Sequence, residues 1–341
     1  MFAPLTTDRL VIRRVEPDDI DDLVARRGHP DVARYQGWTL PYSRERAERW
    51  VAESTAVAGF VEDRWWPTVV VERATGEAVG DLVVRSEWGG RAAEIGYTLT
   101  PAHWGRGFAT EAVEAMVAHL VDELGMTRVH ATLHPDNVAS ARVLERAGFA
   151  YEGTTRNSYW VGEENSDDWC YGLTPDHLRQ WRDRATEPPD EVALVAVTPD
   201  NARAVLRLRT HHSQEAFVAP NVYSFADALV PEIIDGAPVV PWMRAVEADG
   251  ELVGFVMLAE VTEHHPEPYL WRLLVDRLHQ RRGIGARTLA HVEQRCRDLG
   301  ATSLLTSWVD GAGSPRPFYE GRGYVPTGDL VDGEVEARLL L

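Results

Sequence analysis

A short glycine-rich segment, placed between an expected strand and an expected helix, occurs twice in this chain. Residues 104–109 read WGRGFA and residues 280–285 read QRRGIG. A helical pattern follows each segment, over residues 110–124 and over residues 286–299, and both patterns end at a glycine. Two copies of one structural unit are the simplest explanation of such a repeat, so the chain is expected to fold as two similar domains in tandem.

The segments around the two glycine loops also match. Before each loop lie a hairpin-like pair of strands, turned by Thr-Gly or Asp-Gly, and one further strand. After each helix come another strand and a segment that ends in glycine and an aromatic residue. Each half is therefore predicted to contain helices, then an antiparallel meander, and then a strand, the glycine loop, a helix and a strand. The segments are residues 68–72, 79–84, 94–99, 128–133 and 145–149 in the first half, and residues 243–247, 252–258, 269–275, 303–308 and 320–324 in the second.

The segment that separates the two copies is rich in proline and charge. Residues 186–191 read TEPPDE, and they lie between a helical stretch at residues 176–185 and a new alternating strand at residues 192–197. Paired prolines without apolar residues are typical of a linker. The sequence therefore predicts one domain over residues 1–187 and a second over residues 188–341, and a chain of 341 residues suits two domains.

The chain is strongly acidic, with 53 Asp and Glu residues against 35 Lys and Arg residues and a net charge of −18. A surface of this charge repels phosphate backbones and anionic membranes, so no nucleic acid and no membrane partner is expected, whereas a cationic substrate is favoured. The sequence contains arginine but no lysine. Enzymes that use a Schiff-base lysine or a phosphate-loop lysine are therefore excluded.

Neither a disulfide framework nor a metal motif is expected. Cys170 and Cys296 lack metal-ligand spacing and are interpreted as free thiols in a reducing compartment. Adjacent histidines, at residues 211–212 and 264–265, would point to opposite faces of a strand, so no metal site is predicted. The first residues lack the pattern of a signal peptide, and no apolar run approaches the roughly 18 residues of a membrane span. We expect a cytoplasmic protein.

The two glycine loops have the chemistry of anion-binding sites. Glycines let the backbone approach a phosphate closely, and the unpaired N–H groups at the start of the following helix point toward it. Both loops differ from the dinucleotide fingerprint, because the third glycine and the later acidic residue are missing, and both lack the Lys-Ser/Thr of a phosphate-binding loop. The alternative is a helix-start turn whose glycines serve packing alone. Two loops in matched contexts favour anion binding.

Both halves resemble the GNAT superfamily of acetyl-CoA-dependent N-acetyltransferases, whose signature is Gln/Arg-x-x-Gly-x-Gly/Ala between a strand and a helix. Residues 280–285 fit this signature fully, and residues 104–109 fit it with Trp in place of Gln or Arg, as is usual in the RimJ/RimL-type branch. The resemblance implies an α/β (α+β) fold of two tandem GNAT domains, each a mixed, mostly antiparallel sheet flanked by helices.

The two halves resemble different branches of this superfamily. The first half is similar to RimJ/RimL-type acetyltransferases, and the second half is similar to bacterial spermine/spermidine-type acetyltransferases. The matching segments of the first half are residues 7–14, 94–97, 104–111, 137–140 and 147–149. Those of the second half are residues 214–221, Ser224 and residues 271–276, 280–285, 318–324 and 332–334.

The resemblance implies acetyl-CoA as the cofactor and assigns residues to it. Leu99 and Val275, at the ends of the strands before the loops, would each offer an N–H to the thioester carbonyl. Asn137 would bond the pantetheine arm, whereas the second half has Ala312 and Gly313 at the matching place. Loop groups would hold the pyrophosphate: Arg106, Gly107, Ala109 and Thr110 in the first half, and Arg281, Arg282, Gly283, Gly285 and Ala286 in the second.

A general acid is needed for the leaving thiolate. In the second half the resemblance assigns this role to Tyr319, against the alternative of a half-buried core tyrosine. In the first half Leu144 stands at that place and cannot donate a proton. There the resemblance offers Ser140, and a helix N-cap at Asn137 and Ser140 is the alternative.

A general base is needed for the incoming ammonium group. Glu94 lies on the strand where GNAT enzymes often carry a catalytic glutamate, and a surface glutamate on an alternating strand is the alternative. In the second half Glu267 precedes the matching strand, and Glu334 lies in a C-terminal strand that matches the family. Glu334 would act as the base or bind the substrate's ammonium group, and a chain of waters is a further alternative.

The expected activity is transfer of acetyl to a primary amine of a small cationic substrate. A polyamine, an aminoglycoside-like antibiotic or another amine metabolite would qualify, and neutralising its charge fits detoxification or self-resistance. The first domain offers N-terminal protein acetylation as an alternative. A third reading is an acyl-CoA-binding sensor or scaffold with one degenerate domain. The excess of acidic residues argues against aminoacyl transfer from charged tRNA. A homodimer is a possible oligomeric state.

Overall fold

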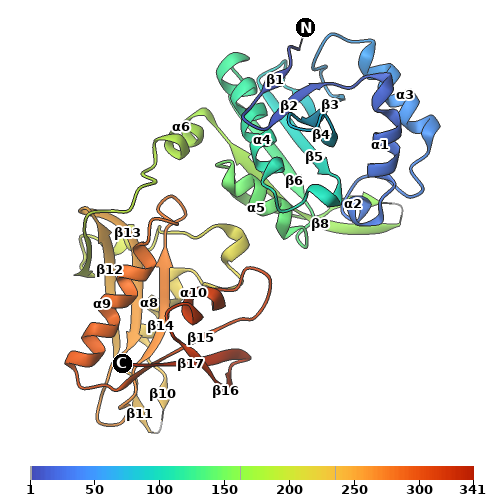
Figure 1. The fold of residues 1–341 in the computed structure, drawn as a ribbon. Coiled ribbons are helices and arrows are strands. Elements are labelled where there is room, and N and C mark those ends of the chain that lie inside the picture. Colours follow the sequence, from blue (N-terminus) through green and yellow to red (C-terminus); the bar gives the residue numbers. More distant parts are fainter. Residues whose placement is uncertain (1, 162, 235) are drawn as a thin grey trace. The chain divides into compact units, whose positions relative to one another are not determined.

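The structure is a computed structural model that describes residues 2–161, 163–234 and 236–341 (Figure 1). The chain divides into two compact units, Met1–Asp183 and Arg184–Leu341. Among the described residues, no helix combines the length and the apolar character that a membrane span requires.

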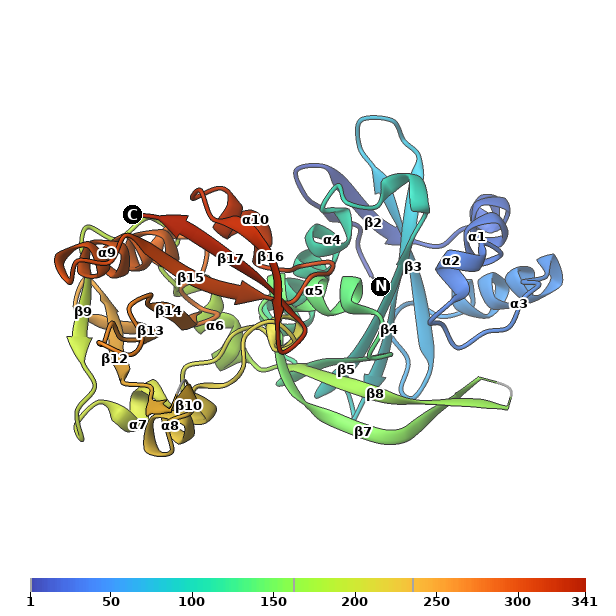
Figure 2. The same ribbon diagram turned by 90° about the horizontal axis from the view of Figure 1, so that it is seen from below.

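The first unit is a mixed sheet with helices on both faces (Figures 1 and 2). Its strands are β1 (Leu5–Thr6), β2 (Leu10–Arg14), β3 (Trp65–Glu72), β4 (Ala78–Glu87), β5 (Ala92–Leu99), β6 (Arg128–Leu133), β7 (Ala150–Val161) and β8 (Glu164–Leu173). Its helices are α1 (Ile20–Arg27), α2 (Pro30–Ala33), α3 (Arg44–Thr55), α4 (Phe108–Ala118), α5 (Val138–Arg146) and α6 (Pro175–Asp183), with 3-10 turns at Pro17–Asp19 and Pro101–His103 and a π-helical turn at His119–Glu123.

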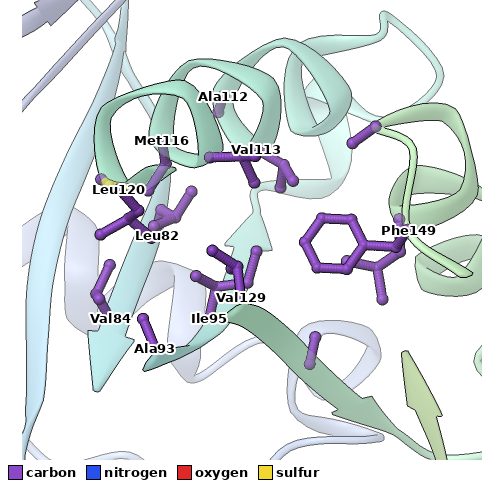
Figure 3. Packing of buried hydrophobic residues seen from close by; sticks show 14 of the residues in the cluster. Leu82, Val84, Ala93, Ile95, Ala112, Val113, Met116, Leu120, Val129 and Phe149 are labelled. Carbon is purple, nitrogen blue, oxygen red and sulfur yellow. The ribbon is translucent and has the colours of Figure 1, made fainter. Parts of the chain in front are cut away.

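The strand order of this sheet is β1-β2-β3-β4-β5-β6-β8-β7. Within the described residues, the strands pair antiparallel except for the parallel neighbours β5 and β6. Helix α4 packs on one face, where its residues Ala112, Val113 and Met116 are buried against Leu82 and Ile95 of the sheet (Figure 3). Because these helix residues recur at a period near 3.6, they form one apolar stripe that fixes α4 on the sheet.

The opposite face of the first sheet buries an ion cluster. Asp81 of β4 accepts hydrogen bonds from Arg26 Nη2 at 3.0 Å and from Arg27 Nη2 at 3.1 Å. The Arg27 guanidinium also lies 4.0 Å from the centre of the Trp50 ring. Burial alone would raise the pKa of the Asp81 carboxyl, but Arg27 and Arg26 together lower it below its usual value. The charged pairs therefore form part of this domain's interior.

The second unit repeats the plan with a sheet of order β16-β17-β15-β14-β13-β12-β9 and a separate β10-β11 pair. Its strands are β9 (Val192–Ala196), β10 (Ile233–Ile234), β11 (Ala237–Pro238), β12 (Pro241–Ala248), β13 (Glu251–Ala259), β14 (Tyr269–Val275), β15 (Ser303–Trp308), β16 (Val325–Val331) and β17 (Glu334–Leu340). Its helices are α7 (Ala202–Val205), α8 (Asn221–Leu229), α9 (Ile284–Asp298) and α10 (Arg316–Glu320), with a 3-10 turn at His212–Gln214.

Both faces of the second sheet carry apolar cores. Leu289 and Val292 of α9 are buried on one face, and Phe255 and Met257 of β13 are buried on the other, where Phe225 of α8 packs against them. Helices α9 and α8 lie on opposite sides of the sheet in both views (Figures 1 and 2). Strands β14 and β15 pair in parallel, and the other neighbours pair antiparallel within the described residues. The predicted fold class of two mixed, mostly antiparallel sheets flanked by helices is confirmed.

The proline-rich segment before β9 is held by the second glycine loop and by α9. The Arg282 Nε–H donates to the carbonyl of Glu187 at 2.8 Å, and the Arg287 guanidinium donates to the carbonyls of Pro189 and Asp190. The boundary between the two compact units lies before this segment in the chain, between Asp183 and Arg184. Residues 187–190 therefore run along the second unit.

Candidate active site

In each unit the parallel pair of strands separates just before the glycine loop. Strand β5 pairs with β6 only from Ala92 to Glu94, and β14 pairs with β15 only at Tyr269 and Leu270. Among the described residues, the rest of β5 and of β14 has no strand partner on that edge. The same gap thus opens beside the end of the strand in both units, where the backbone can pair with another molecule.

In the first unit the end of β5 points its backbone toward this gap. The Thr100 N–H donates to the Val79 carbonyl at 3.0 Å. Leu99 and Gly80 therefore form a non-hydrogen-bonded pair of the antiparallel ladder. The N–H and the carbonyl of Leu99 consequently face away from β4. A Cβ on Gly80 would lie 2.4 Å from the carbonyl oxygen of Thr98, so only glycine fits. The N–H of Leu99 faces the gap, as its predicted role requires.

The second unit repeats this arrangement. The Asp276 N–H donates to the Val253 carbonyl at 2.8 Å, so the N–H of Val275, opposite Gly254, also faces the gap. A Cβ on Gly254 would lie 2.6 Å from the carbonyl oxygen of Leu274. The matched pair Gly80 and Gly254 was missed by sequence reasoning, although each glycine stands one residue after a valine in the matching strands of the two repeats.

The first residue of each glycine signature ties the loop to the strand. The Trp104 Nε1–H donates to the Leu99 carbonyl at 2.9 Å, and the Gln280 Nε2–H donates to the Val275 carbonyl at 3.1 Å. The indole and the amide therefore make the same bond in the two units. This explains in physical terms how Trp can stand in place of Gln in the first signature.

Each loop turns into its helix through a left-handed glycine. Gly107 has φ of 80° and Gly283 has φ of 77°. The Glu111 N–H donates to the Gly107 carbonyl and the Arg287 N–H donates to the Gly283 carbonyl, each at 3.1 Å, so the N–H groups just before them have no partner within the helix. These N–H groups, with the positive end of the helix dipole, suit an anion. They include the predicted positions Ala109 and Thr110 in the first unit, and Gly285 and Ala286 in the second.

The side chains of two loop arginines serve the protein itself. The Arg106 guanidinium pairs with Glu72 and lies 4.4 Å from the centre of the Phe108 ring. The Arg282 side chain is buried and reaches Glu187, as described above. What these residues offer to an anion is therefore their backbone N–H, whereas Arg281 lines a cavity of the second unit.

Arg9 is a loop residue that sequence reasoning missed. Its Nη1–H donates to the Arg106 carbonyl at 2.8 Å, and its guanidinium pairs with Glu111 at 2.6 Å. The side chain is half exposed beside Gly107. Arg9 lies within residues 7–14, one of the segments that resemble RimJ/RimL-type acetyltransferases. That resemblance was the sequence signal by which Arg9 could have been identified as a loop contact.

The second unit contains a cavity of about 1250 Å³. Its walls include both predicted catalytic residues of this unit, Tyr319 and Glu334, and most of the predicted cofactor residues. The cofactor residues on the wall are Val275, Arg281, Gly283, Gly285 and Ala286. The fold thus brings the loop, the strand end and the two candidate catalytic side chains to one cavity.

Tyr319 is both a core residue and part of the cavity wall. Its ring is 8% exposed and stacks on Trp308 with 5.7 Å between ring centres. Burial raises the pKa of the Tyr319 hydroxyl to about 12, although a hydrogen bond with Thr306 acts in the opposite direction. The phenol therefore stays protonated across the neutral range, as a general acid must.

The two candidate carboxylates of the second unit differ in their surroundings. Glu334, the first residue of β17, accepts a hydrogen bond from Ser307 Oγ at 2.6 Å and lies on the cavity wall. Glu267 also lines the cavity, but it is paired with Arg338 at 2.7 Å and accepts a hydrogen bond from Ser303. The ion pair lowers the pKa of Glu267, which makes it a poor base.

In the first unit Asn137 and Ser140 lie at the start of α5. The Asn137 Oδ1 accepts a hydrogen bond from the Ser140 N–H at 3.2 Å, so Asn137 is the N-cap of this helix. The Ser140 Oγ lies 2.8 Å from the hydroxyl of Tyr97, a β5 residue that sequence reasoning did not assign. Burial raises the pKa of Tyr97. Leu144 is fully buried in the core.

Glu94 is a buried, ion-paired residue. It is 8% exposed, it is paired with Arg85, and it accepts a hydrogen bond from Thr132 Oγ1 at 3.1 Å. Ligand atoms of Glu87, Glu94 and His130 lie within 4.8 Å of one another, but the Arg85 guanidinium also pairs with Glu87 at 2.9 Å. The positive charge among these carboxylates is thus supplied by an arginine.

Models of known families match both halves of the chain. The model described as "Acetyltransferase (GNAT) domain" matches residues 9–150, and the model described as "Acetyltransferase (GNAT) family" matches residues 205–324.

Several curated bacterial proteins are similar to one half of the chain. The uncharacterized N-acetyltransferase YoaA of Bacillus subtilis is 34% identical over 174 residues, which are 51% of this chain and 97% of YoaA. The uncharacterized N-acetyltransferase p20 of Bacillus licheniformis is 30% identical over 156 residues, 45% of this chain and 85% of p20. The putative ribosomal N-acetyltransferase YdaF of Bacillus subtilis is 33% identical over 91 residues, 27% of this chain and 48% of YdaF.

Among solved structures, that of Mycobacterium smegmatis RimJ in complex with CoA-disulfide is similar, with 24% identity, a TM-score of 0.45, and coverage of 52% of this chain and 88% of that one. The two family models fall on the two units, and YoaA is covered almost completely. The chain therefore belongs to the GNAT family of acetyltransferases and carries two GNAT domains in tandem.

Proposed function

We propose that the second domain acetylates a primary amine of a small cationic substrate. GNAT enzymes are acetyl-CoA-dependent N-acetyltransferases that differ in the acceptor of the acetyl group. The cavity of the second domain favours a positively charged acceptor, because its walls bear more carboxylates than guanidiniums. The carboxylates are Asp227, Glu232, Glu267, Asp332 and Glu334, and the guanidiniums are Arg272 and Arg281.

The glycine loop of the second domain, with Gly283 in the left-handed conformation, fits the acetyl-CoA pyrophosphate. A Cβ on Gly283 would meet nothing within 4 Å, so the approach to the loop is open. The N–H groups of Gly283, Gly285 and Ala286 would hold the phosphates, and the N–H of Val275 would bond the thioester carbonyl. When bound, acetyl-CoA supplies an activated acetyl group to the amine.

Two side chains of the cavity would handle charge during the transfer. Glu334 would bind the substrate's ammonium group and accept its proton, since its carboxylate lies on the cavity wall. Tyr319 would protonate the departing sulfur, because its hydroxyl keeps its proton at neutral pH. Acetylation removes the positive charge of the amine, which fits detoxification or self-resistance.

The first domain has a second candidate function, N-terminal acetylation of a protein. A similarity to YdaF, whose name describes a putative ribosomal N-acetyltransferase, supports it. Ser140 with Tyr97 and the paired Glu94 would be its acid and base groups. The loop of this domain, with Gly107 at the start of α4, fits acetyl-CoA in the same way as the second loop.

Thiol release from acetyl-CoA tests both functions. The panel should contain diamines, aminoglycosides and peptides with a free N-terminus. We expect release with small cationic amines, reduced by about tenfold or more in Tyr319→Phe and kept in Ser140→Ala. Release with peptides alone, lost in Ser140→Ala and kept in Tyr319→Phe, would overturn the proposal in favour of the first domain. Binding of acetyl-CoA without any release would indicate a sensor or scaffold.

A further inference from the structure

An arginine of β14, next to a β-bulge, lies in the cavity of the second domain. Met257 of β13 faces Arg272, whereas the next residue, Leu258, faces Leu270, so Trp271 is the extra residue of β14. Met257 belongs to the cluster beneath α8, and opposite residues of a ladder share a face. Arg272 therefore stands on the α8 side of the sheet, and it lines the cavity that contains Tyr319 and Glu334.

Within the part of the chain that the structure describes, the Arg272 guanidinium makes one hydrogen bond, from Nε to Ser224 Oγ at 3.1 Å. Among the described residues, no carboxylate oxygen lies within 4.0 Å of it, although Asp227 and Glu334 attract it from farther away. Burial lowers the pKa of this arginine, which reflects the cost of a charge without a counterion. A partly buried guanidinium that faces a cavity in this way suits an anionic group of a ligand.

The first domain has nothing comparable at this register. Three residues before the strand end, Arg272 opposite Met257 corresponds to Gly96 opposite Val83. The two strand ends and loops are otherwise built alike. Because the first domain builds the same loop without an arginine here, Arg272 is not needed for the cofactor loop. It is therefore available to contact the acceptor in the cavity of the second domain.

We propose that Arg272 binds a carboxylate of the acceptor, so the substrate of the second domain is an amino acid that also carries a second amine. This inference rests on the proposed function of that domain. A guanidinium matches a carboxylate in shape and charge and can bond both of its oxygens. The acidic residues that dominate the rest of the cavity wall then receive the two ammonium groups.

Pairs of substrates that differ only in the carboxylate test this assignment. Ornithine and 1,4-diaminobutane form one pair, and lysine and 1,5-diaminopentane form the other. In the unmodified full-length protein, kcat/KM should favour the amino acid of each pair. In Arg272→Gln this preference should fall by about tenfold or more, since a charged hydrogen bond contributes about 1.5–3 kcal/mol. Arg272→Lys should keep part of the preference.

A structural role of Arg272 would lower the rate with both members of a pair equally, and that result would overturn the proposal while leaving the proposed function intact. Thermal melting and CoA affinity check that each variant is folded. If Arg272→Gln does not fold, Ser224→Ala removes the bond that orients the guanidinium and should reduce the same preference.

If no amine in either pair is acetylated, the proposed function fails for these substrates, and the role of Arg272 is then tested by binding. Calorimetry with the CoA-loaded protein should then show tighter binding of ornithine than of 1,4-diaminobutane, and Arg272→Gln should abolish the difference. Equal binding of the two ligands by the unmodified protein would overturn the carboxylate assignment.

Discussion

The two domains are alike where the cofactor would lie and different on the other face of the sheet. In both, a glycine allows close packing beside the strand end, and a left-handed glycine begins the loop helix. One register position beyond Gly80, however, the first domain has Asp81 opposite Thr98, and the second has Phe255 opposite Leu274. The same place in the same fold thus holds an ion cluster in one domain and an apolar core in the other.

This difference teaches which parts of the fold are replaceable. A buried ion pair and a hydrophobic pair of similar volume can give similar stability, because desolvation offsets much of the Coulomb attraction. The geometry of the loop has no such substitute, since it depends on backbone conformations that only glycine adopts at low cost. We therefore expect substitutions in the loops to act on binding in both domains, and substitutions beneath the sheet to act on stability in one.

The largest expected effect is loss of cofactor binding. Gly283→Asp places a side chain and a negative charge at the loop of the second domain, where φ is 77°. Gly107→Asp does the same in the first domain, where φ is 80°. Calorimetry should show two CoA molecules per unmodified chain and one in each variant, because the new carboxylate repels the pyrophosphate.

Matched glycines serve as controls for this experiment. Gly300 and Gly125 also have positive φ with open space around the Cβ position, but they follow the ends of the same helices. Aspartate there carries the same backbone cost of about 1 kcal/mol without approaching the loop. A single CoA per unmodified chain would contradict the two-site comparison.

The next effect concerns the acid of the second domain. Tyr319→Phe removes a hydroxyl with almost no change in volume, so the turnover number should fall by about tenfold or more while the KM for acetyl-CoA changes little. Because the pKa of Tyr319 is raised to about 12, the alkaline limb of the pH profile, where the acid loses its proton, should lie above that of an ordinary tyrosine, near 10.

Tyr324→Phe is the matched control for this prediction. Tyr324 is also buried and packs against Tyr319, but it lies outside the residues that line the cavity. Its variant should keep full turnover. If Tyr319→Phe is fully active while Ser140→Ala or Glu94→Gln abolishes activity, the chemistry belongs to the first domain.

The last comparison separates the domains by stability and is expected to affect binding and turnover least. Asp81→Asn leaves Arg26 and Arg27 buried without a countercharge and should cost about 3–5 kcal/mol in the first domain only. The pKa of Asp81 is lowered, so its contribution is present above the ordinary value of 3.8 and is lost as the pH falls below it. Thermal unfolding followed from pH 7 to pH 3 should show this acid loss in the unmodified protein.

Phe255→Leu provides the comparison in the second domain. This exchange for a smaller apolar side chain at the matching register leaves a cavity, so it should cost about 1–3 kcal/mol and should not change with pH. A pH-independent effect of Asp81→Asn, or an equal shift of both domains' transitions, would contradict the comparison.

Much of the fold could be predicted from the repeat alone. The helix expected at residues 286–299 is α9, and the helix expected at residues 110–124 is α4 with the π-helical turn that follows it. Periodicity and glycine spacing predict these helices because both signals are local. The positions Leu99 and Val275 came from the resemblance, whereas the directions of their N–H groups come from the registers of the two ladders in the structure.

The residues around the expected acceptor site could not be predicted from local sequence patterns. The bulge at Trp271, the contact of Tyr97 with Ser140 and the pairing of Glu94 with Arg85 each join residues through the sheet. A bulge adds one residue, so an alternating pattern that starts at Leu270 would place Arg272 on the opposite face of the sheet. The functional differences between the domains arise from these nonlocal contacts.

The bonds from the second glycine loop and α9 to the proline-rich segment have a consequence for making chimeras. Arg282 and Arg287 stand at the start of the second loop helix, and their guanidiniums are satisfied by the carbonyls of Glu187, Pro189 and Asp190. A graft of the second domain onto a new partner must therefore bring this segment with it. We propose the junction after Asp183, because a splice after Asp190 would exchange the backbone that steadies the loop for a foreign one.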